Sequence, residues 1–453
     1  MTLPQSLAGQ WSPTRFEQRC GWASALHVTP RTIFALSSGS PPAAISIIRV
    51  SGPAAHEAGR ALAGELPDAR HAAVRELRDA DGRLLDEALV LRFDGPASST
   101  GEDLVEFHCH GGRAVVAAVL AALGAMQGLR EAQPGEYTRR AFENGRIDLT
   151  EAEGLADLIE ADTESQRRSA LAMAEGALRK QVEQWQVRVL DLSARAEAAI
   201  DYVDEDTVDA QPDLQRDCAA LASELRSWLE RPRAELLKEG VRVVIAGPPN
   251  AGKSSLLNAI VGQERAIVTD IPGTTRDHID VHLALEGVPL CITDTAGLRA
   301  SDDAVERIGV DRAEALMGIA DVLLWLGESG QAPEHPRPIL VHSKSDLAGR
   351  EEAPTGSLAV SATTGDGLSA LVQAIVNESR GILPAEGQLA LNRRQADSMA
   401  EAEDALRSAS ASAELVLVAE SLRLARNAFD RLTGRAGVED LLDALFGRFC
   451  LGK

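Results

Sequence analysis

The chain has 453 residues, of which 46 are basic and 68 are acidic, so its formal net charge is −22. This length predicts two to four domains, each large enough to bury a core of its own. The negative charge disfavours non-specific binding to nucleic acids, because phosphates are repelled at long range. Hydrophobic residues make up 45% of the chain, which excludes a disordered protein.

Cysteine usage and apolar runs indicate the compartment. The chain contains five scattered cysteines: Cys20, Cys109, Cys218, Cys291 and Cys450. Their odd number and the lack of a C-x-x-C pair indicate a reducing compartment without structural zinc. The longest apolar run, Ala114 to Met126, is too short to span a bilayer. Residues 1–30 lack the apolar core of a secretory signal and are predicted to be a poorly ordered extension. We therefore expect a cytoplasmic protein with no membrane segment.

The first half of the chain predicts two kinds of structure. Over residues 31–145, "AISIIRVSG" and "EALVLRFDG" are typical of strands, "DADGRLLDE" contains a hairpin-like turn, and "RAVVAAVLAALGAM" is typical of a helix. This pattern predicts a mixed α+β domain. Over residues 146–239, apolar residues recur at helical spacing among Ala, Glu and Arg, which predicts long amphipathic helices.

The second half begins with alternating strands and helices. Residues 240–380 contain the apolar runs "VRVVIAG", "VPLCITDTAG", "ADVLLWLG", "RPILVHSKSD" and "LAVSATTG", with helical segments between them. This alternation predicts a doubly wound α/β domain. Residues 381–453 return to a helical composition. The sequence therefore predicts an α/β domain inserted between two halves of a helical domain.

One motif in the α/β domain carries specific chemistry. "GPPNAGKS", from Gly247 to Ser254, fits G-x-x-x-x-G-K-[ST], follows a predicted strand and opens a predicted helix. In that context the loop's backbone N–H groups would cradle phosphates at the helix N-terminus. Lys253 would reach the β- and γ-phosphates, and Ser254 would bind Mg²⁺. The alternative is a glycine-rich strand–helix turn without a ligand.

The other elements of a Ras-like P-loop GTPase follow in order. "GTTRD" offers Thr275 as a ligand for Mg²⁺ and the γ-phosphate. "DTAG" supplies Asp294 for the Mg²⁺ shell and the N–H of Gly297 for the γ-phosphate. The predicted GTP-binding set is Asn250, Ala251, Gly252, Lys253, Ser254, Ser255, Thr269, Asp270, Ile271, Pro272, Gly273, Thr274, Thr275, Asp294, Thr295, Ala296, Gly297, Ser343, Lys344, Asp346, Ser361 and Ala362.

Two of these segments concern the base. Asp346 of "SKSD" can accept two hydrogen bonds from the guanine edge, which favours guanine over adenine, and Lys344 can pack over the base. Ser343 stands where an asparagine is usual and has a shorter side chain. "VSATTG" supplies Ser361 and Ala362 for the last base contact. We expect GTP as the ligand.

The residue after "DTAG" is Leu298, where Ras-like GTPases carry the glutamine that orients the attacking water. Hydrolysis therefore needs another water-orienting group and another positive charge. Glu306 in "DDAVERIG" is a candidate for the first role. Asn250, in the phosphate loop, could help to hold a monovalent cation for the second.

With these residues in view, the sequence resembles the MnmE (TrmE) family of tRNA modification GTPases over residues 31–453. The segments that carry the resemblance are "IIRVSG", "TGEDLVEFHCHGG", "QPGEYTRRAFENGRIDLTEAEGLADLI", "GPPNAGKSSLLNAI", "AIVTDIPGTTRD", "DTAGLR", "VERIG" and "FCLGK".

The resemblance implies a GTPase domain that is activated by K⁺ and dimerises across its nucleotide faces. Residues that match the family's K⁺ ligands are Asn250, Thr269, Ile271 and Thr274. Glu306 matches the water-positioning glutamate of the family.

The resemblance also implies a substrate and partners. The N-terminal domain would form a homodimer and bind a one-carbon carrier, 5-formyl- or methylene-tetrahydrofolate. Arg49, Glu106, Arg146 and Lys453 lie in segments that match the folate site, with Arg146 standing where the family often has lysine. An FAD-dependent MnmG (GidA) partner would complete a heterotetramer that installs an aminomethyl-type group at C5 of the wobble uridine in tRNA.

Some residues leave alternatives open. Arg49 is either a folate ligand or a surface charge at a strand end, whereas Glu106 lies within a strand and needs an arginine or a pterin as partner. His108 and His110 share a strand face and could bind a metal. Cys450, in the terminal "RFCLGK", lacks the flanking residues of a prenylation site. It is either a buried small hydrophobe or a thiol that acts catalytically near the one-carbon carrier.

Two functional hypotheses from different classes follow. In the first, the chain is the GTPase subunit of a tRNA-modifying enzyme. In the second, it is a regulatory, Era-like GTP switch in ribosome assembly. Such a factor would carry a basic RNA-binding appendage, whereas the appended regions here are acidic and end in "FCLGK". These features favour the first hypothesis.

Overall fold

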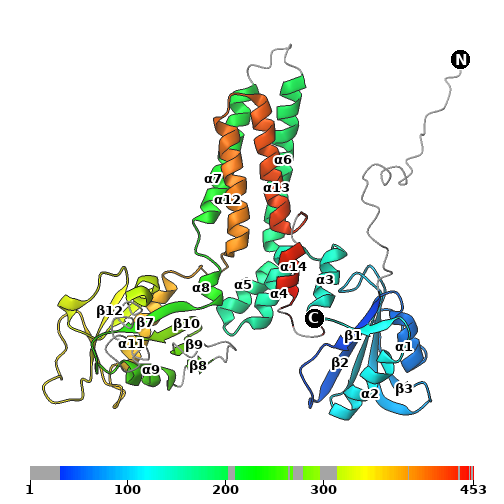
Figure 1. Ribbon diagram of the computed structural model, residues 1–453, viewed down its shortest axis with the longest axis horizontal. Coiled ribbons are helices and arrows are strands. Elements are labelled where there is room, and N and C mark those ends of the chain that lie inside the picture. The colour runs from blue at the N-terminus through cyan, green and yellow to red at the C-terminus, as the bar shows by residue number, and fades with distance from the viewer. Residues whose placement is uncertain are drawn as a thin grey trace, which may run out of the picture. The chain divides into compact units, whose positions relative to one another are not determined.

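The computed structural model describes residues 31–201, 210–263, 266–268, 279–295, 314–385, 387–436, 439–447, 449 and 452. The predicted extension, residues 1–30, lies outside this part. The chain forms two compact units, and α3 (Glu136–Glu143) crosses the boundary between them. Unit 1 extends to Tyr137 and takes in residues 450–453, and unit 2 is Thr138–Phe449. Figure 1 labels the elements of both units.

Unit 1 is built on a six-stranded sheet with the order β3-β4-β5-β2-β1-β6. Only the β1–β6 pair is parallel among its described strands. The strands are β1 (Thr32–Leu36), β2 (Ile45–Ser51), β3 (Ala72–Arg78), β4 (Leu84–Phe93), β5 (Leu104–His110) and β6 (Leu129–Glu131). Both strands and the hairpin predicted for this region are confirmed, since Gly82 closes the turn between β3 and β4 at a φ of 81°.

Helices α1 (Ala55–Ala63) and α2 (Arg113–Gly124) pack on one face of this sheet. Alternation along the strands sends Ile48, Val50 and Phe107 to that face, where all three are fully buried with residues of both helices. Burial of this apolar face stabilises the predicted α+β domain.

The opposite face of the sheet is open over β2, β4 and β3. It carries the apolar side chains of Ile45, Val74 and Leu89, which are 60%, 55% and 36% exposed. Among the described residues, Ala132 and Tyr137 cover this face beside β1. The same face also carries the polar side chains of Arg49 and Glu106. Exposed apolar side chains beside polar ones are a feature of interaction surfaces.

Unit 2 contains a helical domain made from two separated parts of the chain. Helices α6, α7, α12 and α13 lie side by side in a bundle (Figure 1). In the bundle core Trp185 stacks on Phe429, with ring centroids 5.9 Å apart, and meets the edge of Trp228 at 5.3 Å. The helices outside the inserted α/β domain are α3, α4 (Leu149–Glu160), α5 (Glu164–Ala174), α6 (Ala177–Asp201), α7 (Ala210–Leu229), α8 (Glu235–Lys238), α12 (Arg393–Ala411), α13 (Leu415–Thr433) and α14 (Glu439–Phe446). The predicted discontinuous helical domain is confirmed.

None of the helices in the described part of the chain combines the length and the apolar character that crossing a membrane requires.

Between the two helical parts lies an α/β domain with a seven-stranded sheet, in the order β13-β12-β11-β7-β10-β9-β8. The first five strands of this order, β13, β12, β11, β7 and β10, run parallel to one another. Strand β9 runs antiparallel to β10, and β8 runs antiparallel to β9. The elements are β7 (Val241–Ala246), α9 (Lys253–Val261), β8 (Ala266–Val268), β9 (Ile279–Leu285), β10 (Val288–Asp294), β11 (Val322–Trp325), the 3-10 helix η4 (Ser329–Gln331), β12 (Pro338–Ser343), β13 (Leu358–Val360) and α11 (Leu368–Arg380). The predicted strands β7, β10, β11, β12 and β13 are confirmed.

The chain enters and leaves the α/β domain at adjacent points. The backbone N–H of Ala234, before the domain, donates to the carbonyl of Leu391, after it, over 3.1 Å. The N–H of Arg393 donates to the carboxylate of Glu235 at 2.6 Å. These bonds join the two linkers, as an inserted domain requires.

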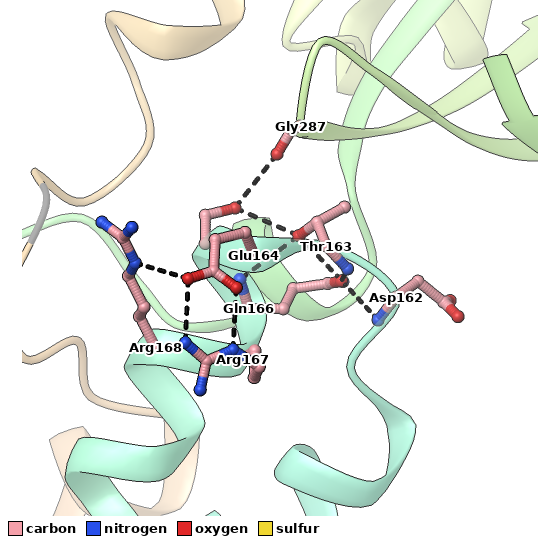
Figure 2. A network of polar contacts seen from close by, with 8 residues as sticks. Asp162, Thr163, Glu164, Gln166, Arg167, Arg168 and Gly287 are labelled. Carbon is pink, nitrogen blue, oxygen red and sulfur yellow. Dashed lines mark hydrogen bonds and ion pairs between the residues drawn. The ribbon is translucent and has the colours of Figure 1, made fainter. Parts of the chain in front are cut away.

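Helix α5 begins beside the β9–β10 turn of the inserted domain (Figure 2). Thr163 and Gln166 form a capping box at its N-terminus, and the hydroxyl of Ser165 donates to the carbonyl of Gly287 at 3.2 Å. Arg167 and Arg168 both pair with Glu164, and these hydrogen bonds lower the pKa of that carboxyl to about 2. The helix start therefore holds the hairpin whose second strand ends at Asp294.

Helix α4 supplies a test of local stability. Asp148 caps it by accepting hydrogen bonds through Oδ1 from the N–H of Glu151 and the hydroxyl of Thr150. Its Oδ2 is buried and has no hydrogen-bond partner in the described part of the chain. Burial raises the pKa of Asp148, so the ionised carboxylate lowers the stability of the folded state.

We predict that Asp148→Ala destabilises α4 by about 1 kcal/mol, because the cap is lost. Asp148→Asn keeps the accepting oxygen without the charge and should be at least as stable as the native chain at neutral pH. Because the folded-state pKa of Asp148 is raised, the advantage of Asn should grow as the pH rises through that pKa. Thermal unfolding and hydrogen exchange in the first turn of α4 measure this. An Asn variant as unstable as the Ala variant would contradict it.

Candidate nucleotide site

The predicted nucleotide residues gather at one edge of the seven-stranded sheet. Because β7, β10, β12 and β13 are parallel, their carboxyl ends meet at the same edge. The phosphate loop, residues 247–252, leaves β7 there; Asp294 ends β10, Ser343 ends β12 and Ser361 follows β13. Segments far apart in the sequence thus form one site.

The phosphate loop turns through conformations that favour glycine. Gly247 has a φ of 149°, and a Cβ there would lie 3.1 Å from the Cβ of Leu326. Gly252 has a φ of 92° and is the N-cap of α9. Between them Asn250 also adopts a positive φ, 61°, which asparagine tolerates better than most residues. The loop therefore presents backbone N–H groups at a helix N-terminus, as phosphate binding needs.

Lys253 is the first residue of α9, directly after this loop. Its side chain is buried, and its ammonium group donates to the carbonyls of Gly247 and Pro248 at 2.9 and 3.0 Å. The positive charge is thereby held at the centre of the loop.

Ser254 and Asp294 come together at the start of α9. The hydroxyl of Ser254 donates to the Asp294 carboxylate at 2.5 Å, and Asp294 is 1% exposed. The next residue, Thr295, donates its hydroxyl to the carbonyl of Ile245 at 2.9 Å. A hydroxyl and a carboxylate in contact are hard oxygen donors of the kind that Mg²⁺ prefers, so these residues fit the predicted ion.

The base-recognition segment is bonded to the phosphate loop. The hydroxyl of Ser343 donates to the carbonyl of Ala251, and the ammonium group of Lys344 donates to the carbonyl of Asn250, both at 2.7 Å. Asp346 is exposed beyond them. Sequence reasoning missed both contacts, because no local pattern links residues that lie more than 90 positions apart.

The last predicted base contact lies in a tight turn. Ser361 is fully buried, and its hydroxyl accepts hydrogen bonds from the N–H groups of Thr363 and Thr364 at 3.2 and 3.1 Å. The side chain of Ser361 therefore stabilises the turn. Of the predicted pair, the half-buried Ala362 is the residue that remains for a contact with the base. Ser255, in the first turn of α9, is exposed.

Several predicted residues lie outside the described part of the chain and stay predictions: Thr269, Asp270, Ile271, Pro272, Gly273, Thr274, Thr275, Ala296, Gly297, Glu306, Cys450 and Lys453.

The predicted folate residues of unit 1 pair with each other. Arg49 of β2 lies opposite Glu106 of β5, and its Nε donates to the carboxylate at 2.8 Å. The hydroxyl of Tyr137 donates to the carbonyl of Arg49 at 2.8 Å. Arg49 is thus an ion-pair partner within the sheet rather than an isolated strand-end charge. Arg146 belongs to unit 2, where it is exposed between α3 and α4.

The two histidines of β5 serve different carboxylates. His108 lies 3.3 Å from Glu106, whereas the ring of His110 lies 2.8 Å from Asp86. In the described chain these residues do not join a third ligand group. The metal hypothesis for them therefore gains no support.

A different group in unit 1 brings possible metal ligands together. Atoms of His56, Asp94 and Asp103 lie within 4.8 Å of one another. Each is already engaged: Arg92 donates to Asp94 at 2.8 Å and lowers the pKa of that carboxyl, and the N–H of Gly95 donates to Asp103 at 2.9 Å. His56 also contacts the carbonyl of Phe93. These contacts tie the loop after β4 to α1, and no sequence spacing predicted them.

Comparison with known proteins places these features in a family. A family model described as "GTP-binding protein TrmE N-terminus" matches residues 32–146, and one described as "MnmE helical domain" matches residues 149–450. The second alone spans more than half of the chain. The chain belongs to the MnmE family.

Relatives in this family cover nearly the whole chain. A protein of Erythrobacter litoralis named "tRNA modification GTPase MnmE" is 54% identical over 424 residues, which span 93% of this chain and 100% of that protein. The MnmE proteins of Novosphingobium aromaticivorans and Zymomonas mobilis are 52% and 48% identical, each over 93% of this chain and at least 99% of their own length. The MnmE assignment supports the hypothesis of a tRNA-modifying GTPase over that of an Era-like assembly switch.

Proposed function

We propose that this GTPase of the MnmE family hydrolyses GTP as a subunit of the enzyme that modifies C5 of the wobble uridine in tRNA. The observation that carries the proposal is the single sheet edge at which the phosphate loop, Asp294, the Ser343–Asp346 segment and Ser361 meet. The acidic chain would meet tRNA through a local basic surface or through a partner, since its net charge of −22 opposes general attraction.

The bound nucleotide would span the whole edge. The loop N–H groups and Lys253 would hold the phosphates, and the Asp346 carboxylate would accept hydrogen bonds from N1–H and the amino group of guanine. Ser254 and Thr275 would bind Mg²⁺, with Asp294 in the surrounding shell. When bound, Mg²⁺ neutralises the charge that develops on the β- and γ-phosphates.

A K⁺ ion is the proposed second positive charge. Its ligands would be Asn250, Thr269, Ile271 and Thr274. The backbone carbonyl of Asn250 already accepts a hydrogen bond from Lys344. The exposed side-chain amide oxygen of Asn250 therefore remains to coordinate the ion. Glu306 would orient the attacking water in place of the glutamine that Leu298 replaces.

Unit 1 would serve the one-carbon chemistry and the homodimer. Arg49 and Glu106, with Arg146 and Lys453, would recognise 5-formyl- or methylene-tetrahydrofolate. Two features support a role for the C-terminus there: Gly452 is buried, and a Cβ on it would lie 2.1 Å from the carbonyl of Leu36 in β1. The exposed side chains of Ile45, Val74 and Leu89 on the open face of the sheet support self-association of this unit.

The remaining partner would be the FAD-dependent MnmG (GidA), in a cytoplasmic heterotetramer that acts on tRNA. Hydrolysis at the sheet edge and group transfer at the folate site are separate chemistries. They can therefore be tested separately.

We predict that Cys450→Ser lowers wobble-uridine modification sharply while GTP hydrolysis persists. The measurement is nucleoside analysis of tRNA from a strain that lacks the gene and carries either the native or the variant copy, beside GTPase assays of the purified proteins. Cys291→Ser is the matched control, because burial raises the pKa of Cys291 to about 11 and leaves its thiol protonated and unreactive at neutral pH. Full modification by the Cys450 variant would show that the thiol only fills space. Full modification in the strain without the gene would refute the proposed function.

We also predict faster GTP hydrolysis in K⁺ than in Na⁺, with Asn250→Lys abolishing the difference, because the ammonium group would replace the ion. Asn258→Lys, at an exposed position of α9, introduces the same charge away from the loop and should keep the K⁺ preference. Steady-state rates in the two salts measure this. Equal rates of the native protein in both salts would contradict the role of Asn250.

A further inference from the structure

Ser343 departs from the asparagine usual at this position, and its hydroxyl is already committed. The side chain is 7% exposed and donates to the carbonyl of Ala251 over 2.7 Å. The backbone carbonyl of Ser343 accepts a hydrogen bond from Nε of Arg350 at 3.0 Å, which fixes the residue from the other side.

The donor inventory of serine limits what Ser343 can do for a base. A hydroxyl has one hydrogen to donate, and a carbonyl oxygen can only accept, so the hydrogen of Ser343 is used by Ala251. Guanine presents N7 and O6 as acceptors on the edge that faces away from N1 and the amino group. Ser343 therefore has no hydrogen left for either atom. An asparagine amide, with two N–H groups, could serve both partners.

Ala251 occupies a sensitive position in the phosphate loop. It lies between Asn250 and Gly252, which both have positive φ, and directly precedes the turn into α9. The bond from Ser343 to Ala251 runs beside the bond from Lys344 to Asn250. Two consecutive carbonyls of the loop are thus held from β12, and this restrains the loop whose N–H groups receive phosphates.

We propose that Ser343 is a positioning residue for the phosphate loop, and that this protein recognises guanine without a hydrogen bond from residue 343 to N7. The inference rests on the proposed nucleotide site. Base selectivity then comes from Asp346 and from the turn at Ser361 and Ala362. Ser343 changes the affinity for every nucleotide by the same factor, whichever base it carries.

The test compares GDP with 7-deaza-GDP, which carries C–H in place of N7, by calorimetric titration of the full-length protein with Mg²⁺ and K⁺. Ser343→Ala should weaken both nucleotides by the same factor, about 2- to 10-fold, as expected for one lost hydrogen bond. The ratio of the two affinities should therefore not change. Ser343→Thr, which keeps the hydroxyl, should restore both affinities.

Two further variants sharpen the comparison. In Ser343→Asn the ratio of GDP affinity to 7-deaza-GDP affinity should be about 2- to 10-fold higher than in the native protein. The reason is that the asparagine amide has a free N–H for N7. Ser227→Ala is the control: it removes an exposed serine hydroxyl on α7, outside the nucleotide site, that donates to the carbonyl of Glu224 at 2.7 Å, and it should not affect either affinity.

Three outcomes would overturn the inference. One is a preference for GDP over 7-deaza-GDP that disappears in Ser343→Ala, because Ser343 would then be the N7 donor. Another is an unchanged GDP affinity in a folded Ser343→Ala variant, checked by its thermal unfolding. The third is Ser343→Asn with the native ratio of affinities. Failure of the proposed site itself looks different: Lys253→Ala would then bind GDP as tightly as the native protein.

Discussion

The nucleotide site depends on how one loop satisfies its backbone hydrogen bonds. Between β7 and α9 the chain leaves the sheet through positive φ angles at Gly247, Asn250 and Gly252. Its carbonyls accept hydrogen bonds from cations and a hydroxyl of the protein: Lys253 donates to those of Gly247 and Pro248, Lys344 to that of Asn250, and Ser343 to that of Ala251. The N–H of Ala251 donates to the carbonyl of Pro248 at 3.3 Å, and the other N–H groups of the loop can receive phosphates, as the helix N-terminus favours.

The rest of unit 2 holds this loop in place. The linkers on either side of the inserted domain bond to each other, and the start of α5 bonds to the β9–β10 turn. Strand β10 runs from that turn to Asp294, which accepts the hydroxyl of Ser254. A continuous set of contacts therefore leads from the helical domain to the proposed Mg²⁺ ligands. Unit 1, with its own core and its open sheet face, carries Arg49 and Glu106 of the proposed folate residues.

Much of this could be predicted from sequence, because the decisive signals are local. The phosphate loop combines glycines with Lys253 and Ser254 at fixed spacing, and the strands that end at the site are short apolar runs bounded by turns. Glu106 was expected to need an arginine or a pterin as partner, and Arg49 pairs with it across one strand pair. The strands β8 and β9 were not predicted, since β8 has three residues and β9 mixes Asp280 and His282 with apolar residues. The bond between Ser343 and Ala251 depends on tertiary structure and has no sequence signature.

The central claim is that this sheet edge binds guanine through Asp346. Xanthine carries an oxygen at C2 where guanine carries an amino group, so it needs a donor where guanine needs an acceptor. Asp346→Asn should therefore change the preferred nucleotide, with kcat/KM falling for GTP and rising for XTP relative to the native protein. Measuring hydrolysis of both nucleotides by both proteins tests the claim directly. We predict a reversal of preference; a variant that keeps the native preference for GTP would contradict the site.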